Sequence, residues 1–277
     1  MKTICSLIAL ISLCLTGRGQ TNCTLFTNPR CALACRLYNA SDSFGQGWRK
    51  SQEYLDSAIH LCPEYADAWH EISVPYLKRG DFLTWRKYID VAVALKPEVY
   101  LLTRGWCRFK FLRDYEGALD DFKKNDTITN FTPGQTGDGS YNTYVVMAIC
   151  ERELGHYPES FIYFSKGIDS VYQNKGIAWV GLYDYVHRAV ARIRLGDYKS
   201  ALSDLDSENK KYESYAETWY YMGIVYRFTD RIKEAKACFE KAKRLFNGEG
   251  YHFSDPYCEM TDAIYLSDID KALQSVP

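Results

Sequence analysis

A short turn sequence recurs along this chain of 277 residues. Its five copies begin at Gly80, Arg113, Gly155, Gly196 and Asp230. Successive copies start 33, 42, 41 and 34 residues apart, and in four of the five a small residue and then an aromatic residue or Leu follow at fixed distances. A period of this size is typical of architectures that stack short helical units, each burying its apolar face only against its neighbours. The chain is therefore expected to be all-α and built from helical hairpins.

The repeat pattern is clearest over residues 216–249. It consists of Trp219, Met222, Gly223 and Tyr226 on a first helix, and Ala235, Phe239 and Ala242 on a second. Gly223 and Ala235 are small because the two helices must approach closely where these residues meet. The pattern closely resembles the tetratricopeptide signature W-x2-L-G-x2-Y followed by A-x3-F-x2-A, with Met in place of Leu. This resemblance implies an α–α superhelix, the tetratricopeptide (TPR) solenoid.

The same reading divides most of the chain into about six repeats and a cap. The expected repeats are residues 32–63, 66–97, 99–125, 141–168, 182–208 and 216–249, followed by a capping helix over 256–275. The two longer spacings require insertions on either side of the fourth repeat, which we place as loops at Asp126–Asn142 and Ser170–Gly181. Longer loops of repeat proteins often lie on the binding face.

The first residues have the features of a secretory signal peptide. Lys2 precedes the apolar run Ile4–Leu15, whose 12 residues are too few to span a bilayer. We expect residues 1–19 to be removed by cleavage between Gly19 and Gln20. The alternative is an uncleaved N-terminal anchor. With cleavage, we expect no stable membrane insertion and an exported protein of the bacterial envelope, periplasmic or secreted.

Charge and cysteine content restrict partners and compartment. The formal net charge is −1, and it becomes −3 once residues 1–19 are removed, so a nucleic-acid partner is not expected. Eight of the ten cysteines lie after the signal peptide. In an exported chain the N-terminal cluster Cys23, Cys31, Cys35 and Cys62 offers candidates for disulfides, and the spacing leaves their pairing open. Cys107, Cys150 and Cys238 fall within helical patterns and are interpreted as buried free thiols.

The sequence contains no catalytic or metal-binding motif that we can identify. The five histidines are not at metal-ligand spacing, and no phosphate-binding or nucleophile motif is present. Two acidic pairs, Asp120 with Asp121 and Asp204 with Asp206, lie on expected second helices and are interpreted as solvent-exposed charge. We therefore expect a non-enzyme without cofactor or metal.

The resemblance places the candidate binding surface on the first helices, which line a concave groove in tetratricopeptide proteins. The candidate residues are His70, Lys78, Lys110, Phe111, Arg152, Tyr183, Arg194, Tyr220, Arg227 and Phe228. The cations among them stand near the ends of successive first helices, where stacking would align them into a stripe for an acidic segment. The alternative is that they only complement the helix dipole.

The expected function is a non-catalytic scaffold or adaptor that presents this groove to a protein or peptide partner. The alternative is a glycan- or cell-wall-binding module that uses the groove aromatics. The sequence does not identify the partner, the biological process or the oligomeric state.

Overall fold

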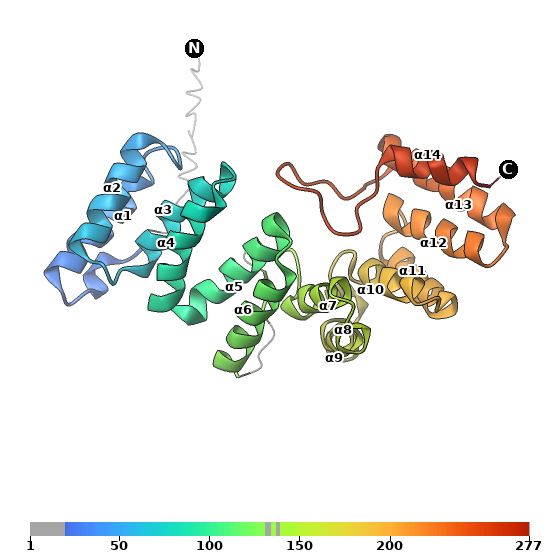
Figure 1. Cartoon of the computed structure of the whole chain (residues 1–277), viewed down its shortest axis with the longest axis horizontal. Coiled ribbons are helices and arrows are strands. Elements are labelled where there is room, and N and C mark those ends of the chain that lie inside the picture. Colours follow the sequence, from blue (N-terminus) through green and yellow to red (C-terminus); the bar gives the residue numbers. More distant parts are fainter. Residues whose placement is uncertain (1–19, 131–133, 137–138, 277) are drawn as a thin grey trace, which may run out of the picture. The chain divides into compact units, whose positions relative to one another are not determined.

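The structure is a computed structural model that describes residues 20–130, 134–136 and 139–276 (Figure 1). The expected signal peptide, residues 1–19, lies outside the described residues. The described chain is helical and has isolated β-bridges but no named strand, which confirms the all-α class. No helix within the described ranges is long and apolar enough to cross a membrane.

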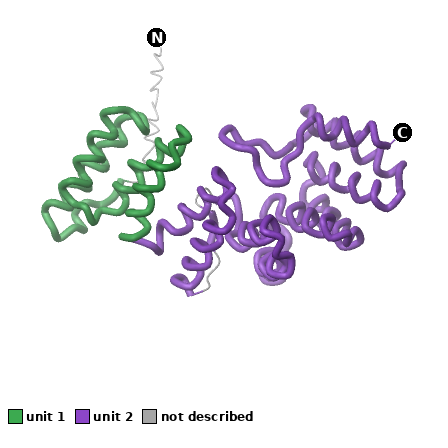
Figure 2. The backbone as a smooth tube through the Cα atoms, viewed as in Figure 1, with its two compact units in different colours: residues 1–95 green, residues 96–277 purple. Residues whose placement is uncertain are grey.

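The chain divides into two compact units, the first ending at Leu95 and the second beginning at Lys96 (Figure 2). The helices of the first unit are α1 Pro29–Ser41, α2 Arg49–Leu61, α3 Ala66–Lys78 and α4 Phe82–Leu95. Those of the second are α5 Pro97–Cys107, α6 Tyr115–Ile128, α7 Thr143–Glu153, α8 Tyr157–Phe164, α9 Ser170–Lys175, α10 Asp184–Arg194, α11 Tyr198–Lys211, α12 Ala216–Phe228, α13 Ile232–Arg244 and α14 Leu266–Gln274. Successive helices of each expected repeat pack as antiparallel hairpins.

The recurring turn has one conformation at all five places. Its first residue has a positive φ, between 55° and 83°, in Gly80, Arg113, Gly155, Gly196 and Asp230. This left-handed residue ends a first helix and reverses the chain into the second. Three copies use glycine, which adopts this conformation without strain. The sequence period therefore reflects a repeated helix-ending geometry.

Close helix approach explains the small residues of the repeat. A methyl group added to Gly223 would lie 2.5 Å from Cε1 of Phe239, so the ring of α13 occupies the space that any side chain on α12 would need. Phe239 and Ala235 are fully buried. The tight α12–α13 contact agrees with the reason given above for a small residue at position 223.

Two disulfides stabilise the first unit. Cys23 pairs with Cys35, and Cys31 pairs with Cys62, which joins α1 to the end of α2. Both bonds lie in a small core in which the Tyr65 ring makes edge-to-face contacts with Phe26 and Tyr38. The structure thus pairs all four candidate cysteines.

The three cysteines interpreted as buried free thiols, Cys107, Cys150 and Cys238, are buried and unpaired by disulfides. This confirms that interpretation.

Two of the acids interpreted as solvated are buried, which corrects the sequence interpretation. Asp121 is 0% exposed and accepts hydrogen bonds from Arg104 and Arg108 at 2.6–3.0 Å. Asp204 has the same arrangement with two arginines of α10, Arg188 and Arg192. In both hairpins the first helix carries arginines four residues apart that enclose one carboxylate of the second helix.

The expected boundaries differ from the structure at two places. Ser170–Gly181, expected as a loop, begins with α9, which continues α8 through a π-helical turn at Ser165–Asp169. The expected capping helix over 256–275 starts only at Leu266, and the residues before it are not helical. The cause is local. Oδ1 of Asp255 accepts the backbone N–H groups of Tyr257 and Cys258, which closes an Asx turn where a helix was expected.

Candidate interaction groove

Residues 251–265, here called the return segment, connect the end of α13 to α14 within the second unit. In Figure 1 they form the long irregular loop that runs back from α14. Of these fifteen residues only Thr261 and Ile264 are buried as whole residues, so the segment lies on the surface of the helices beneath it. The first helices α5, α7, α10 and α12, or the residues at their ends, supply its partners. We therefore treat their shared face as the candidate interaction groove.

The return segment begins with backbone pairing beside α12. Tyr251 N–H donates to the Ser214 carbonyl at 2.8 Å, and Ala216 N–H donates to the Tyr251 carbonyl at 2.9 Å, which is an isolated parallel β-bridge. Two residues later, Phe253 N–H donates to Glu217 Oε1 at 2.7 Å. An extended segment is thus hydrogen-bonded through its backbone at the start of α12.

An aromatic stack holds the next part of the segment. The Phe253 ring lies 3.4 Å from the Tyr183 ring, centroid to centroid, with an interplanar angle of 27°. It also stacks on His187, at 5.6 Å and 26°. Tyr183 immediately precedes α10 and has a φ of 64°, the left-handed conformation.

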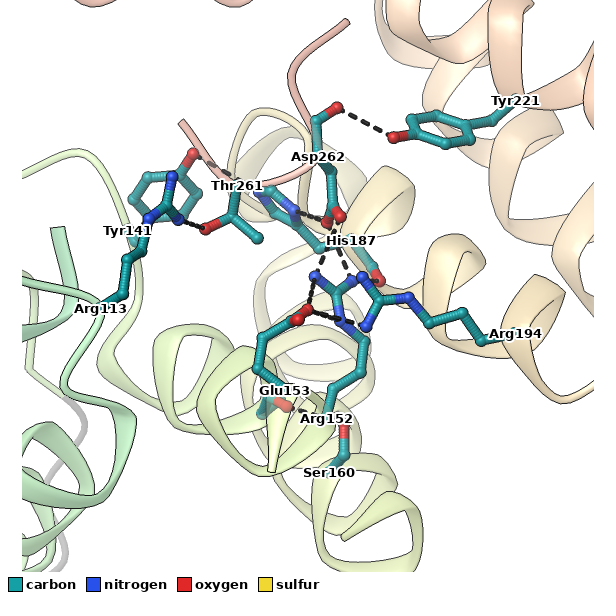
Figure 3. Close-up of polar contacts among 11 residues, drawn as sticks. Arg113, Tyr141, Arg152, Glu153, Ser160, His187, Arg194, Tyr221, Thr261 and Asp262 are labelled. Carbon is teal, nitrogen blue, oxygen red and sulfur yellow. Dashed lines mark hydrogen bonds and ion pairs between the residues drawn. The ribbon is translucent and has the colours of Figure 1, made fainter. Parts of the chain in front are cut away.

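The carboxylate of Asp262 is the centre of the polar contacts (Figure 3). Both of its oxygens accept from the Arg152 guanidinium at 2.9 Å, and Oδ2 lies 2.7 Å from Nδ1 of His187. The Asp262 carbonyl accepts from the Tyr221 hydroxyl at 3.1 Å. Side chains of α7, α10 and α12 therefore converge on one residue of the return segment.

The charges around Asp262 decide its ionisation. Burial by itself raises the pKa of the carboxyl group, but Arg152 and His187 outweigh it and hold the pKa of Asp262 well below its usual range. The Arg152 side chain is 0% exposed and also pairs with Glu153, which in turn lies 3.0 Å from Arg194. The groove thus holds an ionised carboxylate in a buried basic site.

A second group of contacts lies at the end of α5. Lys110 Nζ is 2.7 Å from Oδ2 of Asp255. Arg113 donates to the Thr261 hydroxyl at 2.7 Å (Figure 3). It also donates to the carbonyl of Glu259. These contacts complete the set, so each first helix of the second unit or its terminal turn contributes at least one side chain to the return segment.

The structure brings together some of the candidate residues. Lys110, Arg152 and Tyr183 contact the return segment directly, and Arg194 is linked to it through Glu153. The Phe111 ring lies beside Lys110, whose Nζ is 5.6 Å from the ring centroid. In this structure residues of the return segment contact Lys110, Arg152 and Tyr183.

The other candidate residues lie elsewhere. Tyr220 packs with Phe239 and the α14 residue Leu273, and Arg227 donates to Ser275 at 3.0 Å. Phe228 is half exposed and stacks on Tyr198.

The remaining two candidates belong to the first unit. Lys78 Nζ donates to Gln46 at 2.5 Å. Burial lowers the pKa of His70.

Sequence reasoning missed the residues at the centre of the groove: Arg113, His187, Glu217, Tyr221 and Asp262. A signal was available for His187, because it follows the candidate residue Tyr183 by four residues, about one helical turn. For Asp262 no local signal exists, since its partner Arg152 lies 110 residues away.

The two insertions meet at a pocket of about 650 Å³ in the second unit. Gln135, Ser140 and Asn142 line it from the first insertion, and Asn174, Lys175 and Trp179 from the second. Trp179 is 70% exposed, and the Tyr212 ring lines the pocket as well. Residues 137–138 of the first insertion lie outside the described chain.

Comparison with known proteins identifies the repeat. The family model of the tetratricopeptide repeat matches residues 216–247, the same segment in which the signature is clearest. Residues 216–247 are a tetratricopeptide repeat. A curated relative, tetratricopeptide repeat protein 12 of Mus musculus, is 29% identical over 91 residues, which are 33% of this chain. The match spans only 12% of the mouse protein.

Solved tetratricopeptide-type structures share the fold at low identity. YrrB, described as a TPR protein with an unusual peptide-binding site, is 14% identical with a TM-score of 0.51 over 72% of this chain and 95% of its own. PilW, a type IV pilus biogenesis factor, is 13% identical with a TM-score of 0.59 over 78% of this chain and 95% of its own. PilF of Pseudomonas aeruginosa is 14% identical with a TM-score of 0.54, over 79% and 91%. These likenesses support the repeat solenoid as the fold.

Proposed function

We propose that the chain is a non-catalytic interaction scaffold whose groove in the second unit binds an extended segment of a protein partner. The observation that carries the proposal is the return segment itself, since four successive first helices hold a non-helical stretch of polypeptide by backbone, ring and carboxylate contacts. The tetratricopeptide repeat at 216–247 and the peptide-binding site in the printed description of YrrB agree with this reading.

The groove is poorly suited to catalysis. His187 and Asp262 have the geometry of a general base and its orienting acid. However, His187 is 1% exposed, its ring stacks on Phe253, and its Nε2 faces the Tyr141 hydroxyl at 3.4 Å. A substrate cannot reach the imidazole without displacing the return segment, so the pair is better explained as a means of positioning Asp262.

Export is part of the proposal. The N-terminal features of a signal peptide and the pairing of four cysteines in the first unit both favour an oxidising compartment outside the cytoplasm. We place the protein in the bacterial periplasm or among secreted proteins, where pilus-associated proteins of this fold such as PilW offer an analogy.

Site-specific photocrosslinking tests the scaffold function. A benzophenone amino acid would be placed at Phe111 or at Tyr257, both beside the groove, and at Leu83 of the first unit as a matched exposed control. We expect one partner protein to be captured in the native host from both groove positions and not from Leu83. Capture of the same proteins from all three positions, or of none, would argue against a groove partner.

A second candidate function is the binding of a glycan or cell-wall fragment. The pocket between the two insertions favours it, because amide and hydroxyl side chains there surround the exposed Trp179 and Tyr212 rings. Chemical-shift or fluorescence titration with soluble peptidoglycan fragments would test it. Binding that survives Trp179→Ala, or no binding at all, would remove this candidate.

A further inference from the structure

The return segment makes the kinds of contact that a bound peptide makes, whereas a simple linker between α13 and α14 would not need them. Its backbone pairs beside α12, one ring is inserted against Tyr183, and one carboxylate enters a buried basic site. Six of its fifteen residues are exposed, and among them Tyr251 and Tyr257 are each 67% exposed. The segment therefore alternates anchored and exposed residues, as peptides bound in grooves do.

The ion pair at Asp262 favours specificity over stability. A carboxylate buried with a guanidinium loses its hydration, so the pair adds little net stability compared with an apolar contact. Removing only one partner leaves a buried charge unpaired, which is costly. Without Asp262, Arg152 would keep Glu153 as its ion-pair partner, but His187 and half of the guanidinium contacts would lose their carboxylate. An acidic residue is therefore favoured at this place while both side chains remain buried, whether the return segment or another chain supplies it.

The two helices on either side of the return segment also contact each other directly. Before the segment, α13 packs against α12, and after it, α14 packs on α13 through Ile269 and Ala272. Gly248, with a φ of 113°, lies in the turn that precedes the segment. The segment is thus a loop anchored at both ends, held near the groove at a high effective concentration.

From these observations we infer a specific partner class and a regulated site, an inference that rests on the proposed function. We propose that the groove recognises an acidic, non-helical segment with an aromatic residue nine positions before an aspartate, as Phe253 precedes Asp262. We further propose that residues 251–265 occupy this site in cis, so that a partner binds only by displacing them. The chain is then self-inhibited until a segment of matching chemistry competes.

The test measures binding of a fluorescent peptide with the sequence of residues 251–265, with blocked ends, to the full chain. In the wild type the resident segment competes, so binding is weak. In the double variant Phe253→Ala/Asp262→Asn the resident segment loses its ring and carboxylate contacts, and we expect the peptide to bind about tenfold tighter or more. A peptide with Asn in place of the residue equivalent to Asp262 should lose that gain. Tyr257→Ala, at an exposed position of the same segment, is the matched control and should bind like the wild type.

Two further measurements make the outcome decisive. Hydrogen exchange should show that the amides of Tyr251 and Phe253 lose protection in the double variant while α12 and α13 keep theirs, which separates release of the segment from unfolding. If exchange rises through α12 and α13 as well, or if wild type and double variant bind the peptide equally, the inference is wrong. Adding Arg152→Met to the double variant should abolish peptide binding.

The result is independent of the test of the scaffold function. Groove crosslinks to a partner without peptide competition would leave the scaffold function standing and overturn self-inhibition. Peptide competition without any cellular crosslink would support occupation of the groove by residues 251–265 and argue against the scaffold function.

Discussion

At the scale of single residues, burial and backbone conformation decide what each side chain contributes. Glu217 is fully buried on α12, and Oε1 accepts the Phe253 N–H. Its other oxygen, Oε2, is buried without a hydrogen-bond partner among the described residues. Burial raises the pKa of Glu217 to about 7.

Replacing Glu217 by Gln should therefore stabilise the chain in a pH-dependent way. Since the folded-state pKa is raised above the unfolded value, both states keep the proton well below pH 4.5, stability is lost as the pH rises from 4.5 to about 7, and the loss is constant above that. Glu217→Gln keeps the acceptor oxygen and removes that loss. We expect little change in the free energy of unfolding at pH 4 and a gain of roughly 1–3 kcal/mol at pH 8, measured by urea denaturation.

The exposed substitution Glu240→Gln on α13 serves as the control and should show no such trend. A stability difference for Glu217→Gln that is the same at pH 4 and pH 8 would mean that folding does not shift the pKa of this carboxyl group.

At the scale of elements, the hairpin is the unit that the sequence encodes. Each hairpin needs a left-handed residue between its helices and small residues where the helices meet. Two of the hairpins add a buried carboxylate, Asp121 or Asp204, enclosed by arginines of the first helix. The turn could be predicted because it depends on neighbours in sequence. The burial of these acids could not, because exposure depends on which face of the second helix turns inward.

Adding one methyl group at the closest α12–α13 contact should destabilise the hairpin. Gly223→Ala improves helix propensity by about 1 kcal/mol, but the new Cβ would lie 2.5 Å from Phe239, which is itself fully buried. We expect overpacking to prevail, with a net loss of about 1–2 kcal/mol in the free energy of unfolding. Lys236→Ala, at an exposed position of α13, is the control, and thermal melts followed by circular dichroism provide the measurement.

A stabilised Gly223→Ala variant would show that the Phe239 ring can move aside. The double variant Gly223→Ala/Phe239→Leu tests the same point directly, since a smaller residue at 239 should recover part of the loss caused by the methyl group.

At the scale of the whole molecule, the two compact units are stabilised by different means. The first carries both disulfides, and the second carries the buried ion pairs and the return segment. The cysteines of the second unit, Cys107, Cys150, Cys238 and Cys258, form no disulfide. Reducing conditions should therefore affect the two units differently.

Reduction of the Cys31–Cys62 bond should destabilise the first unit selectively. The bond closes a loop with a sequence separation of 31, and loss of such a crosslink costs about 3–4 kcal/mol in the chain-entropy model. We expect the double variant Cys31→Ser/Cys62→Ser to increase amide exchange in α1 and α2 while α10–α13 keep their protection. Equal loss of protection in both units would show that they unfold as one.

Features of this protein that depend on residues close together in sequence could be predicted, and features that depend on distant residues could not. The helices of the hairpins and the three buried free thiols follow from patterns a few residues long. The capping helix was placed about ten residues too early, because Asp255 followed by Pro256 can start a helix or close an Asx turn, and only the observed hydrogen bonds distinguish the two. The groove depends on pairs such as Arg152 with Asp262, which no local pattern connects.

The amino-acid sequence by itself determined the repeat architecture of this protein. Left-handed turn residues, small contact residues and apolar periodicity act between near neighbours, so they can be read along the chain. Only the tertiary structure decided what lies against the first helices of the second unit. There the return segment places Phe253 on Tyr183 and Asp262 on Arg152. Such contacts depend on where folding brings distant segments together, and a buried carboxylate is stable only once that folding supplies its cation.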